Sequence, residues 1–301
     1  MRTQVLLNPN GSGGDVYPFL AIGQKLQRLG HHVGVMTNPL FKPQVGQAGL
    51  EFISIGTEND LEQVGRSLHA QPKLQAWQLA LQWTARSAAE IVDYLDSRRL
   101  RYPTMLVGSP LSFGMRLLAE KYGMPMATLI LSPYVLRSVS ASPNMPPLWL
   151  QPWMPKSLKS WQYWAADRWA IDKVLQPELG RLRRKLGLPS MRRFMHQWCF
   201  SPELNLGCFP EWFAPLQPDW PKGFLHVGPV HWDPTTSDLG PTNATLSSSS
   251  DVAQLPMAIL AGSAGPPSAE FYQAWIAAAA ALDRELILLE KDLALLPSPL
   301  P

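Results

Sequence analysis

Short apolar runs alternate with longer amphipathic stretches through the first two thirds of the chain. Runs of four to eight apolar residues without polar alternation are typical of strands buried on both faces, and apolar positions three or four apart are typical of helices. The runs predict strands at 4–7, 32–37, 50–56, 104–108, 126–131, 204–209 and 224–229, and the amphipathic stretches predict helices at 15–29, 38–48, 72–98, 113–122 and 158–186. This alternation predicts an α/β fold, in which a doubly wound, Rossmann-like parallel sheet carries helices on both faces.

Two segments interrupt the alternation. Residues 57–71 are polar, and we predict a loop there. Residues 138–159 are rich in Pro, Ser, Trp and Met, and we predict a long ordered loop, of a kind that is often functional. Its tryptophans Trp149 and Trp153 favour either a pocket for an apolar ligand or a membrane-facing lip, and the alternative is a loop that packs on its own sheet.

The helix predicted at 158–186 carries further aromatic and basic residues. We predict that its tryptophans Trp161, Trp164 and Trp169 lie on its apolar, buried side. A basic cluster follows, made of Arg181, Arg183, Arg184, Lys185, Arg192 and Arg193. A solvated helix face is the preferred interpretation of this cluster, and attraction of an anionic lipid or a phosphate is the other.

The last quarter of the chain has a different composition. Residues 231–254 are rich in Ser and Thr with few apolar side chains, which predicts an interdomain linker. A second strand–turn–helix–strand unit is predicted after it, with its helix at 269–282 and with Phe271, Trp275 and Ile276 toward the core. The predicted domains are therefore 1–230, the linker 231–254, and a truncated β-α-β unit at 255–301.

The candidate chemistry begins at the glycine-rich turn after the first strand. Gly11, Gly13 and Gly14 allow a tight turn and a close approach of a ligand to the backbone, and Asp15 can cap the following helix. Ligands of open parallel sheets bind at the carboxyl ends of the strands. The candidate substrate-binding residues at this edge are Asn10, Gly11, Ser12, Gly13, Gly14, Ser109 and Ser132, to which Trp149 and Trp153 are added from the long loop.

Other interpretations of this turn fit less well. A dinucleotide site, and with it a nicotinamide-dependent oxidoreductase, is disfavoured because Val16 stands where the third glycine is required and Thr37-Asn38 stand where an acidic residue is expected. A P-loop is excluded because no Gly-Lys-Ser/Thr follows the glycines. Asp15 could also be a helix cap and nothing more.

Composition narrows the possible partners and the compartment. The 301 residues are 46% hydrophobic and carry a formal charge of +3, which does not suggest nucleic acid binding. Cys199 and Cys208 lack metal-ligand spacing and are interpreted as reduced, buried thiols, so no metal site is predicted. Neither a signal peptide nor an apolar run of about 18 residues is seen, and we expect a cytoplasmic protein.

The stretch from Gly11 to Gly23, followed by Leu29-Gly30-His31-His32-Val33, resembles the amino-terminal motif of sugar-nucleotide-dependent glycosyltransferases with the two-domain GT-B fold. It is most similar to the sterol and the macrolide or glycopeptide glycosyltransferases, whose family-28-like amino-terminal domain opens this way. Pro210–Pro221 and Phe224–Pro229 resemble the segments that close this domain, so the resemblance covers residues 1 to about 230.

The resemblance implies a hexosyltransferase that moves a sugar from a nucleotide-sugar, expected to be a UDP-sugar, to a hydroxyl of a lipid, sterol or other apolar acceptor. It implies inversion at the anomeric carbon, with Asp15 as general base or acceptor-orienting group. It also implies that Gly262 and Ser263 lie near the donor diphosphate. The nucleotide-sugar is a co-substrate, and no further cofactor is expected. Lipid glycosylation would bring peripheral membrane contact.

The chain departs from the family pattern in its last quarter. None of its six histidines is followed by Gly-Gly and no Asp-Gln pair occurs, although these motifs mark the donor site of the family. The donor-binding domain is therefore expected to be incomplete. The alternative function is a catalytically inactive acceptor-binding fragment, or one half of a split glycosyltransferase whose donor domain is supplied by a second chain.

Overall fold

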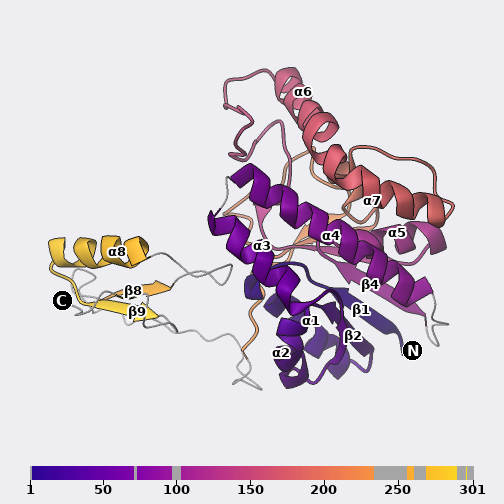
Figure 1. Ribbon diagram of the computed structural model, residues 1–301, viewed down its shortest axis with the longest axis horizontal. Helices are drawn as coiled ribbons and strands as arrows, with labels where there is room; N and C mark the ends of the chain where they lie inside the picture. Colours follow the sequence, from indigo (N-terminus) through magenta and orange to yellow (C-terminus); the bar gives the residue numbers. More distant parts are fainter. Residues whose placement is uncertain are drawn as a thin grey trace. The chain divides into compact units, whose positions relative to one another are not determined.

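The structure is a computed structural model that describes residues 2–70, 73–96, 103–233, 256–260, 269–289 and 296 (Figure 1). The chain divides into two compact units, Met1–Pro234 and Thr235–Pro301. No helix in the described ranges combines the length and the apolar character needed to cross a bilayer.

The larger unit is built on a seven-stranded sheet in which every pairing is parallel. The strands follow the order β3-β2-β1-β4-β5-β6-β7. Their bounds are β1 Gln4–Asn8, β2 His32–Thr37, β3 Glu51–Ser54, β4 Thr104–Gly108, β5 Met126–Ile130, β6 Leu204–Gly207 and β7 Phe224–His226. The order reverses between β1 and β4, which confirms the predicted doubly wound, Rossmann-like α/β fold.

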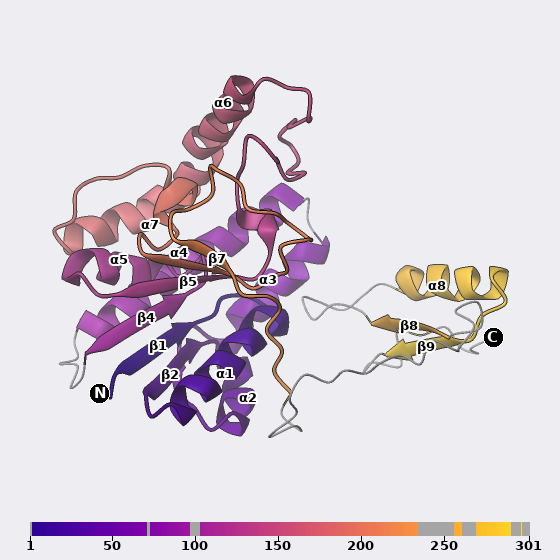
Figure 2. The same cartoon turned by 180° about the vertical axis from the view of Figure 1, so that it is seen from behind.

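Helices cover both faces of the sheet. Successive residues of each strand point to opposite sides, so each strand contributes to two cores. On one face Val5 and Leu7 pack with α1 (Gly13–Arg28) and α2 (Lys42–Gln47). On the other face Leu6 packs in a core that includes residues of α4, α5 and α7. These helices span Lys73–Asp96, Phe113–Tyr122 and Asp172–Lys185 (Figures 1 and 2). The helix α1, which packs on the first of these faces, follows the glycine-rich turn directly in the chain.

The predicted loop at 57–71 is wrong, because α3 occupies Glu58–Ala70. The N–H and Oγ1 of Thr57 both donate to Asp60 Oδ2, at 2.7 and 2.6 Å, which closes the first turn of this helix. Few of its apolar side chains are covered: Leu61 packs against the core that contains α1, and Val64 is buried. A capped helix with so few apolar positions resembles a polar loop when hydrophobicity alone is considered.

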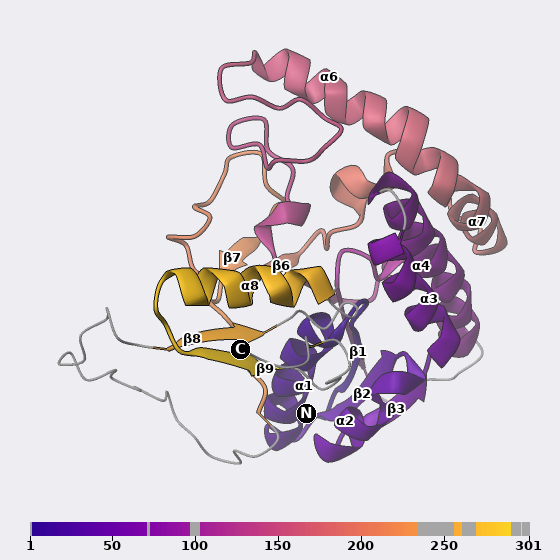
Figure 3. The ribbon, with the colours of Figure 1, turned by 60° about the vertical axis from the view of Figure 1, so that its left-hand side comes forward.

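The helical stretch predicted at 158–186 consists of α6 (Lys156–Ala166), a π-helical segment at Asp167–Ile171, and α7. In Figures 1 and 3, α6 extends beyond the layer formed by α4 and α7, which lie side by side. The prediction that its three tryptophans are buried is wrong, because Trp161, Trp164 and Trp169 are all exposed. The buried side of the helix holds Lys159 and Tyr163 instead.

The basic cluster is also corrected in part. Arg183 is buried, and its guanidinium donates two 2.8 Å hydrogen bonds to the carboxylate of Glu120 on α5. Trp198 Nε1 donates to the same carboxylate at 2.7 Å. These donors hold the pKa of Glu120 below its usual range, against the opposing effect of its own desolvation. Arg183 therefore joins α7 to α5 and does not lie on a solvated face.

The remaining short elements are the 3-10 turns at Pro39–Phe41 and Pro133–Val135 and a π turn at Phe194–Trp198. The loop predicted at 138–159 has no regular structure up to Pro155, and its last residues, 156–159, belong to α6.

The smaller unit contains the parallel strands β8 (Met257–Leu260) and β9 (Leu286–Leu289) and the helix α8 (Ala269–Ala281). This is the predicted strand–helix–strand order. Its helix buries Tyr272 and Ala279 and leaves Trp275 exposed. The prediction that Trp275 faces the core is therefore wrong. Residues 234–255, which include most of the predicted linker, lie outside the described residues, as do Gly262 and Ser263.

Candidate functional site

The glycine-rich turn joins the carboxyl end of β1 to α1. Ser12 is the N-cap residue of α1, and Asp15 lies in its first turn. The Ser12 N–H donates to Asp15 Oδ2 at 2.8 Å, and the Ser12 hydroxyl donates to the same oxygen at 3.3 Å. The carboxylate is thereby fixed above the turn, at the sheet edge where open parallel sheets bind their ligands.

Gly11 is required by this arrangement. Its φ is +131°, which disfavours any L side chain, and a Cβ placed on it would overlap Oδ2 of Asp15. Gly13 is buried, and a Cβ there would lie 3.1 Å from the ring of Tyr17. Gly14 is exposed, and its nearest neighbour would be Ser12 Oγ at 3.8 Å. The glycines thus differ in how strictly the fold needs them.

Gly11→Ala is expected to lower the free energy of unfolding by about 2 kcal/mol, through strain at positive φ and displacement of the Asp15 carboxylate. Urea unfolding followed by circular dichroism measures the change. Gly14→Ala is the matched control and should leave stability unchanged or slightly raised, because its position is open and helical. Equal losses in the two variants would contradict this account of Gly11.

The environment of Asp15 changes its acidity. Burial raises the pKa of this carboxyl above its ordinary value, and the hydrogen bonds from the Ser12 N–H and hydroxyl offset part of the increase. A carboxylate with a raised pKa is a stronger base than one in water. The geometry therefore provides a fixed proton acceptor at the sheet edge.

A buried polar network supports the turn from the segment that follows the neighbouring strand β4. Ser112 lies at its centre: its Oγ donates to the carbonyl of Asn8 at 2.7 Å and accepts from Asn10 Nδ2 at 3.0 Å. It also accepts from the N–H of Ser109 at 2.8 Å. Asn10 and Ser109 thus lie together, as the sheet topology predicted, and their hydroxyl and amide groups contact at 3.4 Å. Their predicted contact with a substrate stays a prediction.

Sequence reasoning did not select Asn8 or Ser112. Asn8 is almost fully buried, and its side-chain amide donates to the carbonyl of Met36 on β2 at 2.7 Å. Together the two residues connect three strands at the edge that carries the turn. Two features of the sequence could have identified them: Asn8 is a polar residue at the end of an apolar strand, and Ser112 is a serine immediately before a helix.

The other predicted residues lie elsewhere on the larger unit. Ser132 follows β5, is exposed, and accepts a 3.3 Å hydrogen bond from the N–H of Tyr134. Trp149 and Trp153 lie on the loop before α6, both exposed, and contact each other edge to face with ring centroids 5.2 Å apart. The structure thus groups the turn with Ser109 and Asn10, and it places the two tryptophans in a separate aromatic pair.

The cysteines are free and buried, as predicted. Desolvation raises the pKa of the Cys199 thiol to about 12 and that of Cys208 to about 11, so both are protonated at neutral pH. Among the residues that the structure describes, no group of three or more His, Cys, Asp and Glu side chains is placed to hold a metal ion.

Comparisons with known proteins identify a family domain in the larger unit. Residues 5–140, which include the turn, Asp15 and the Ser109–Ser112 segment, match the glycosyltransferase family 28 N-terminal domain. An uncharacterized glycosyltransferase of Mycobacterium leprae is 30% identical over 188 residues, which are 61% of this chain and 42% of that protein. A sterol 3-beta-glucosyltransferase of Arabidopsis thaliana is 45% identical over 53 residues, 18% of this chain and 8% of its own length. The chain spans about two fifths of the length of the mycobacterial relatives.

Solved structures give the same fold. The glycosyltransferase of kitacinnamycin matches with a TM-score of 0.62 and 16% identity, over 99% of this chain and 70% of that one. The glycosyltransferase SnogD of Streptomyces nogalater matches with a TM-score of 0.56 and 19% identity, over 100% and 69%. The predicted resemblance is confirmed: residues 5–140 match the glycosyltransferase family 28 N-terminal domain, and the fold is that of solved GT-B glycosyltransferases.

Proposed function

We propose that the chain acts in glycosyl transfer, moving a hexose from a nucleotide-sugar, such as a UDP-sugar, to a hydroxyl of a lipid, sterol or other apolar acceptor. The observation that carries the proposal is the family 28 match over residues 5–140. The partial sterol glucosyltransferase relative supports an apolar acceptor. A lipid or sterol acceptor resides in a membrane, so peripheral contact with a membrane surface belongs to the same proposal.

In this proposal Asp15 is the catalytic base or the group that orients the acceptor hydroxyl. The hydroxyl proton leaves as the oxygen attacks the anomeric carbon, because a free carboxylate is far too weak to deprotonate an alcohol beforehand. The nucleoside diphosphate departs with the bonding electron pair, and the attack inverts the anomeric centre. The raised pKa of Asp15 favours its acceptance of the proton.

The acceptor is proposed to bind along the glycine-rich turn, whose backbone at 10–14 a ligand can approach closely. Ser132 is exposed at the same edge of the sheet. The donor diphosphate is proposed to lie near Gly262 and Ser263, after the first strand of the smaller unit.

Binding of the acceptor without transfer is the second candidate function. It is favoured because the family match at residues 5–140 lies wholly within the larger unit, which carries Asp15 and the glycine-rich turn.

Calorimetric titration with UDP and UDP-glucose, followed by an assay of labelled glucose transfer to a panel of sterols and lipid alcohols, tests the two functions. Donor affinity in the micromolar range together with labelled product supports transfer by this chain. Binding of an acceptor by a cooperatively melting chain that does not bind donor supports the acceptor-binding function. A folded chain that binds neither overturns both.

A further inference from the structure

Five exposed tryptophans lie along the loop before α6, along α6 itself and at its junction with α7. We name Trp149, Trp153, Trp161, Trp164 and Trp169 the tryptophan ridge. Their exposed fractions lie between 41% and 69%. Indole rings are ordinarily among the most buried side chains, so five exposed ones in one region mark an interaction surface.

The five rings form two groups that α6 holds together. Trp164 and Trp161 contact Trp169 edge to face, with ring centroids 5.7 and 6.5 Å apart, and Trp149 contacts Trp153 at 5.2 Å. The side-chain amide of Gln162 on α6 bonds the backbone N–H and carbonyl of Trp149, both at 2.8 Å. The loop pair is therefore fixed beside the helix that carries Trp161 and Trp164.

Buried polar contacts support α6 from beneath. Lys159 is buried and its Nζ donates to the carbonyl of Val139 at 3.4 Å, while Tyr163 donates to the carbonyl of Ser138 at 3.3 Å. An amphipathic helix ordinarily buries its aromatic residues and exposes its lysines. Here the reverse arrangement is held by specific hydrogen bonds, so exposure of the tryptophans is a built feature of the fold.

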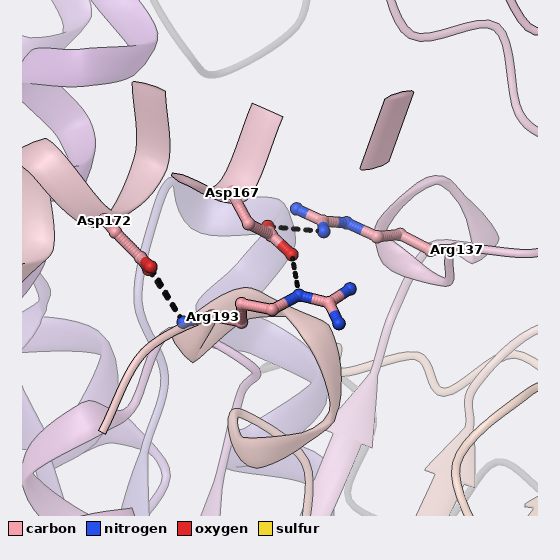
Figure 4. Close-up of polar contacts among 4 residues, drawn as sticks. All are labelled: Arg137, Asp167, Asp172 and Arg193. Atoms are coloured by element: carbon pink, nitrogen blue, oxygen red, sulfur yellow. Dashed lines mark hydrogen bonds and ion pairs between the residues drawn. The ribbon is translucent and has the colours of Figure 1, made fainter. Parts of the chain in front are cut away.

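An ion cluster fixes the far end of the ridge. Asp167, fully buried in the π-helical segment, pairs with Arg137 at 2.6 Å and with Arg193 at 3.0 Å (Figure 4). Both oxygens of Asp172 accept from the Arg193 N–H at 2.9 Å. These contacts lie two and three residues from Trp169, and they hold it on the surface.

The exposed charged side chains between residues 149 and 173 are all positive. The chain contains no Asp or Glu from Lys121 to Ala166, and the two acidic residues between 149 and 173 are Asp167 and Asp172, which are buried. Lys156, Arg168 and Lys173 are exposed in the same segment. Trp169 and Lys173 also line one hollow of about 370 Å³, with Arg86 and Glu178 on its wall, so aromatic and cationic groups adjoin there.

We propose that the tryptophan ridge docks the chain on the surface of a bilayer that contains anionic phospholipids. Indole rings favour the interface between headgroups and acyl chains, and cations beside them attract anionic headgroups. A protein partner is the less suitable occupant, because the centres of protein interfaces are depleted in lysine. The proposal deepens the proposed function. It rests on that function in one respect, because the docked chain would reach its lipid or sterol acceptor at the membrane.

Vesicle flotation tests the docking directly, with no sugar nucleotide or acceptor present. The 301-residue chain is expected to float with vesicles made of phosphatidylglycerol and phosphatidylcholine and to show a blue shift of its tryptophan fluorescence. Raising the salt from about 0.1 M to about 1 M should weaken binding, because the Debye length falls from about 10 Å to about 3 Å. Binding should be weak on phosphatidylcholine alone.

Two sets of variants separate the aromatic and the ionic contributions. Replacement of Trp161, Trp164 and Trp169 by Ser should weaken binding by about tenfold or more, because the burial of even one aromatic side chain changes an equilibrium constant by about that factor. Replacement of Lys156, Arg168 and Lys173 by Gln should weaken it roughly 100-fold, at about fivefold for each cation. The melting temperature of each variant verifies its fold.

Matched controls come from exposed residues elsewhere on the chain. Trp212→Ser with Phe213→Ser removes two exposed aromatic rings that stand beside the acidic Glu211, and Gln at Lys25, Lys42 and Lys222 removes three exposed cations. These controls should bind vesicles as the unaltered chain does. The proposal is overturned if the ridge variants also bind unchanged, if the controls lose as much, or if the ridge variants alter self-association and the chain does not float.

The outcome is independent of catalysis. A chain that floats but neither binds donor nor transfers sugar retains the docking surface and overturns the transferase proposal. A chain that glucosylates a detergent-dispersed acceptor but does not float overturns the docking surface alone.

Discussion

Asp15→Asn is expected to lower kcat for glycosyl transfer by roughly 10²–10⁴-fold, the usual contribution of a general base. Asn has nearly the shape of Asp and retains an oxygen that can accept the 2.8 Å hydrogen bond from the Ser12 N–H. The turn and the start of α1 should therefore persist, while the group that accepts the proton is lost. Transfer of labelled glucose at saturating donor and acceptor measures the effect.

The pH dependence of transfer provides a second readout of the same variant. The raised pKa of Asp15 means that the carboxylate is lost as the pH falls through a value above the ordinary one for Asp. Activity of the unaltered chain should fall with that protonation. Residual activity of Asp15→Asn should not show this step.

Stability should respond to the same ionisation with the opposite sign. Since the folded-state pKa is raised, the folded chain binds more protons than the unfolded chain between the two pKa values, and stability decreases as the pH rises through this window. Asp15→Asn should remove that decrease, which urea unfolding over a pH series detects.

Ser12→Ala distinguishes orientation from proton transfer. It removes the 3.3 Å contact of the Ser12 hydroxyl with Asp15 and leaves the backbone bond in place. The loss in kcat should be much smaller than that in Asp15→Asn. Full activity in Asp15→Asn would remove Asp15 from the mechanism and return it to the role of a helix cap.

Asp167→Asn is expected to destabilise the larger unit by about 3 kcal/mol, because it leaves Arg137 and Arg193 without the buried carboxylate that compensates them. For a unit of this size the melting temperature should fall by roughly 10 °C. Differential scanning calorimetry measures the change. The two arginines come from segments 26 to 30 residues away on either side, so the pairing connects the loop before α6 to the loop after α7 (Figure 4).

Glu178→Gln is the matched control for this loss. Its carboxylate pairs with Arg181 one turn away on the exposed side of α7, where solvent screens the interaction. The melting temperature should not change measurably. If Asp167→Asn melts with the unaltered chain, the buried cluster contributes nothing to stability and the proposed support of the tryptophan ridge fails with it.

The sequence by itself determined the layered α/β fold and the position of the glycine-rich turn. The reason is that these features are local: the buried run of β1, the glycines after it and the apolar face of α1 are consecutive in the chain. Each leaves a signature of composition and period within a few residues. The same locality made the family resemblance visible around Asp15, since the whole motif lies within one strand, one turn and one helix.

Periodicity gave the spacing of apolar residues on a helix but not the side that is buried. On α6 the sequence indicated burial of the tryptophans, whereas the structure buries Lys159 and Tyr163, and on α8 it buries Tyr272 and exposes Trp275. In α6 the decision depends on acceptors from other segments, such as the carbonyls of Ser138 and Val139. Hydrophobicity along the helix contains no information about them.

Tertiary structure alone determined which partners the buried polar residues have. Ser112 meets Asn8 across 104 residues of sequence, and Arg183 meets Glu120 across 63. Burial of a charged or polar group is favourable only where a partner satisfies it, and such a partner is brought near by the fold. The chain thus specifies its strands, turn and family through neighbouring residues, while the contacts that position the candidate site and expose the tryptophan ridge arise between residues that are distant in sequence.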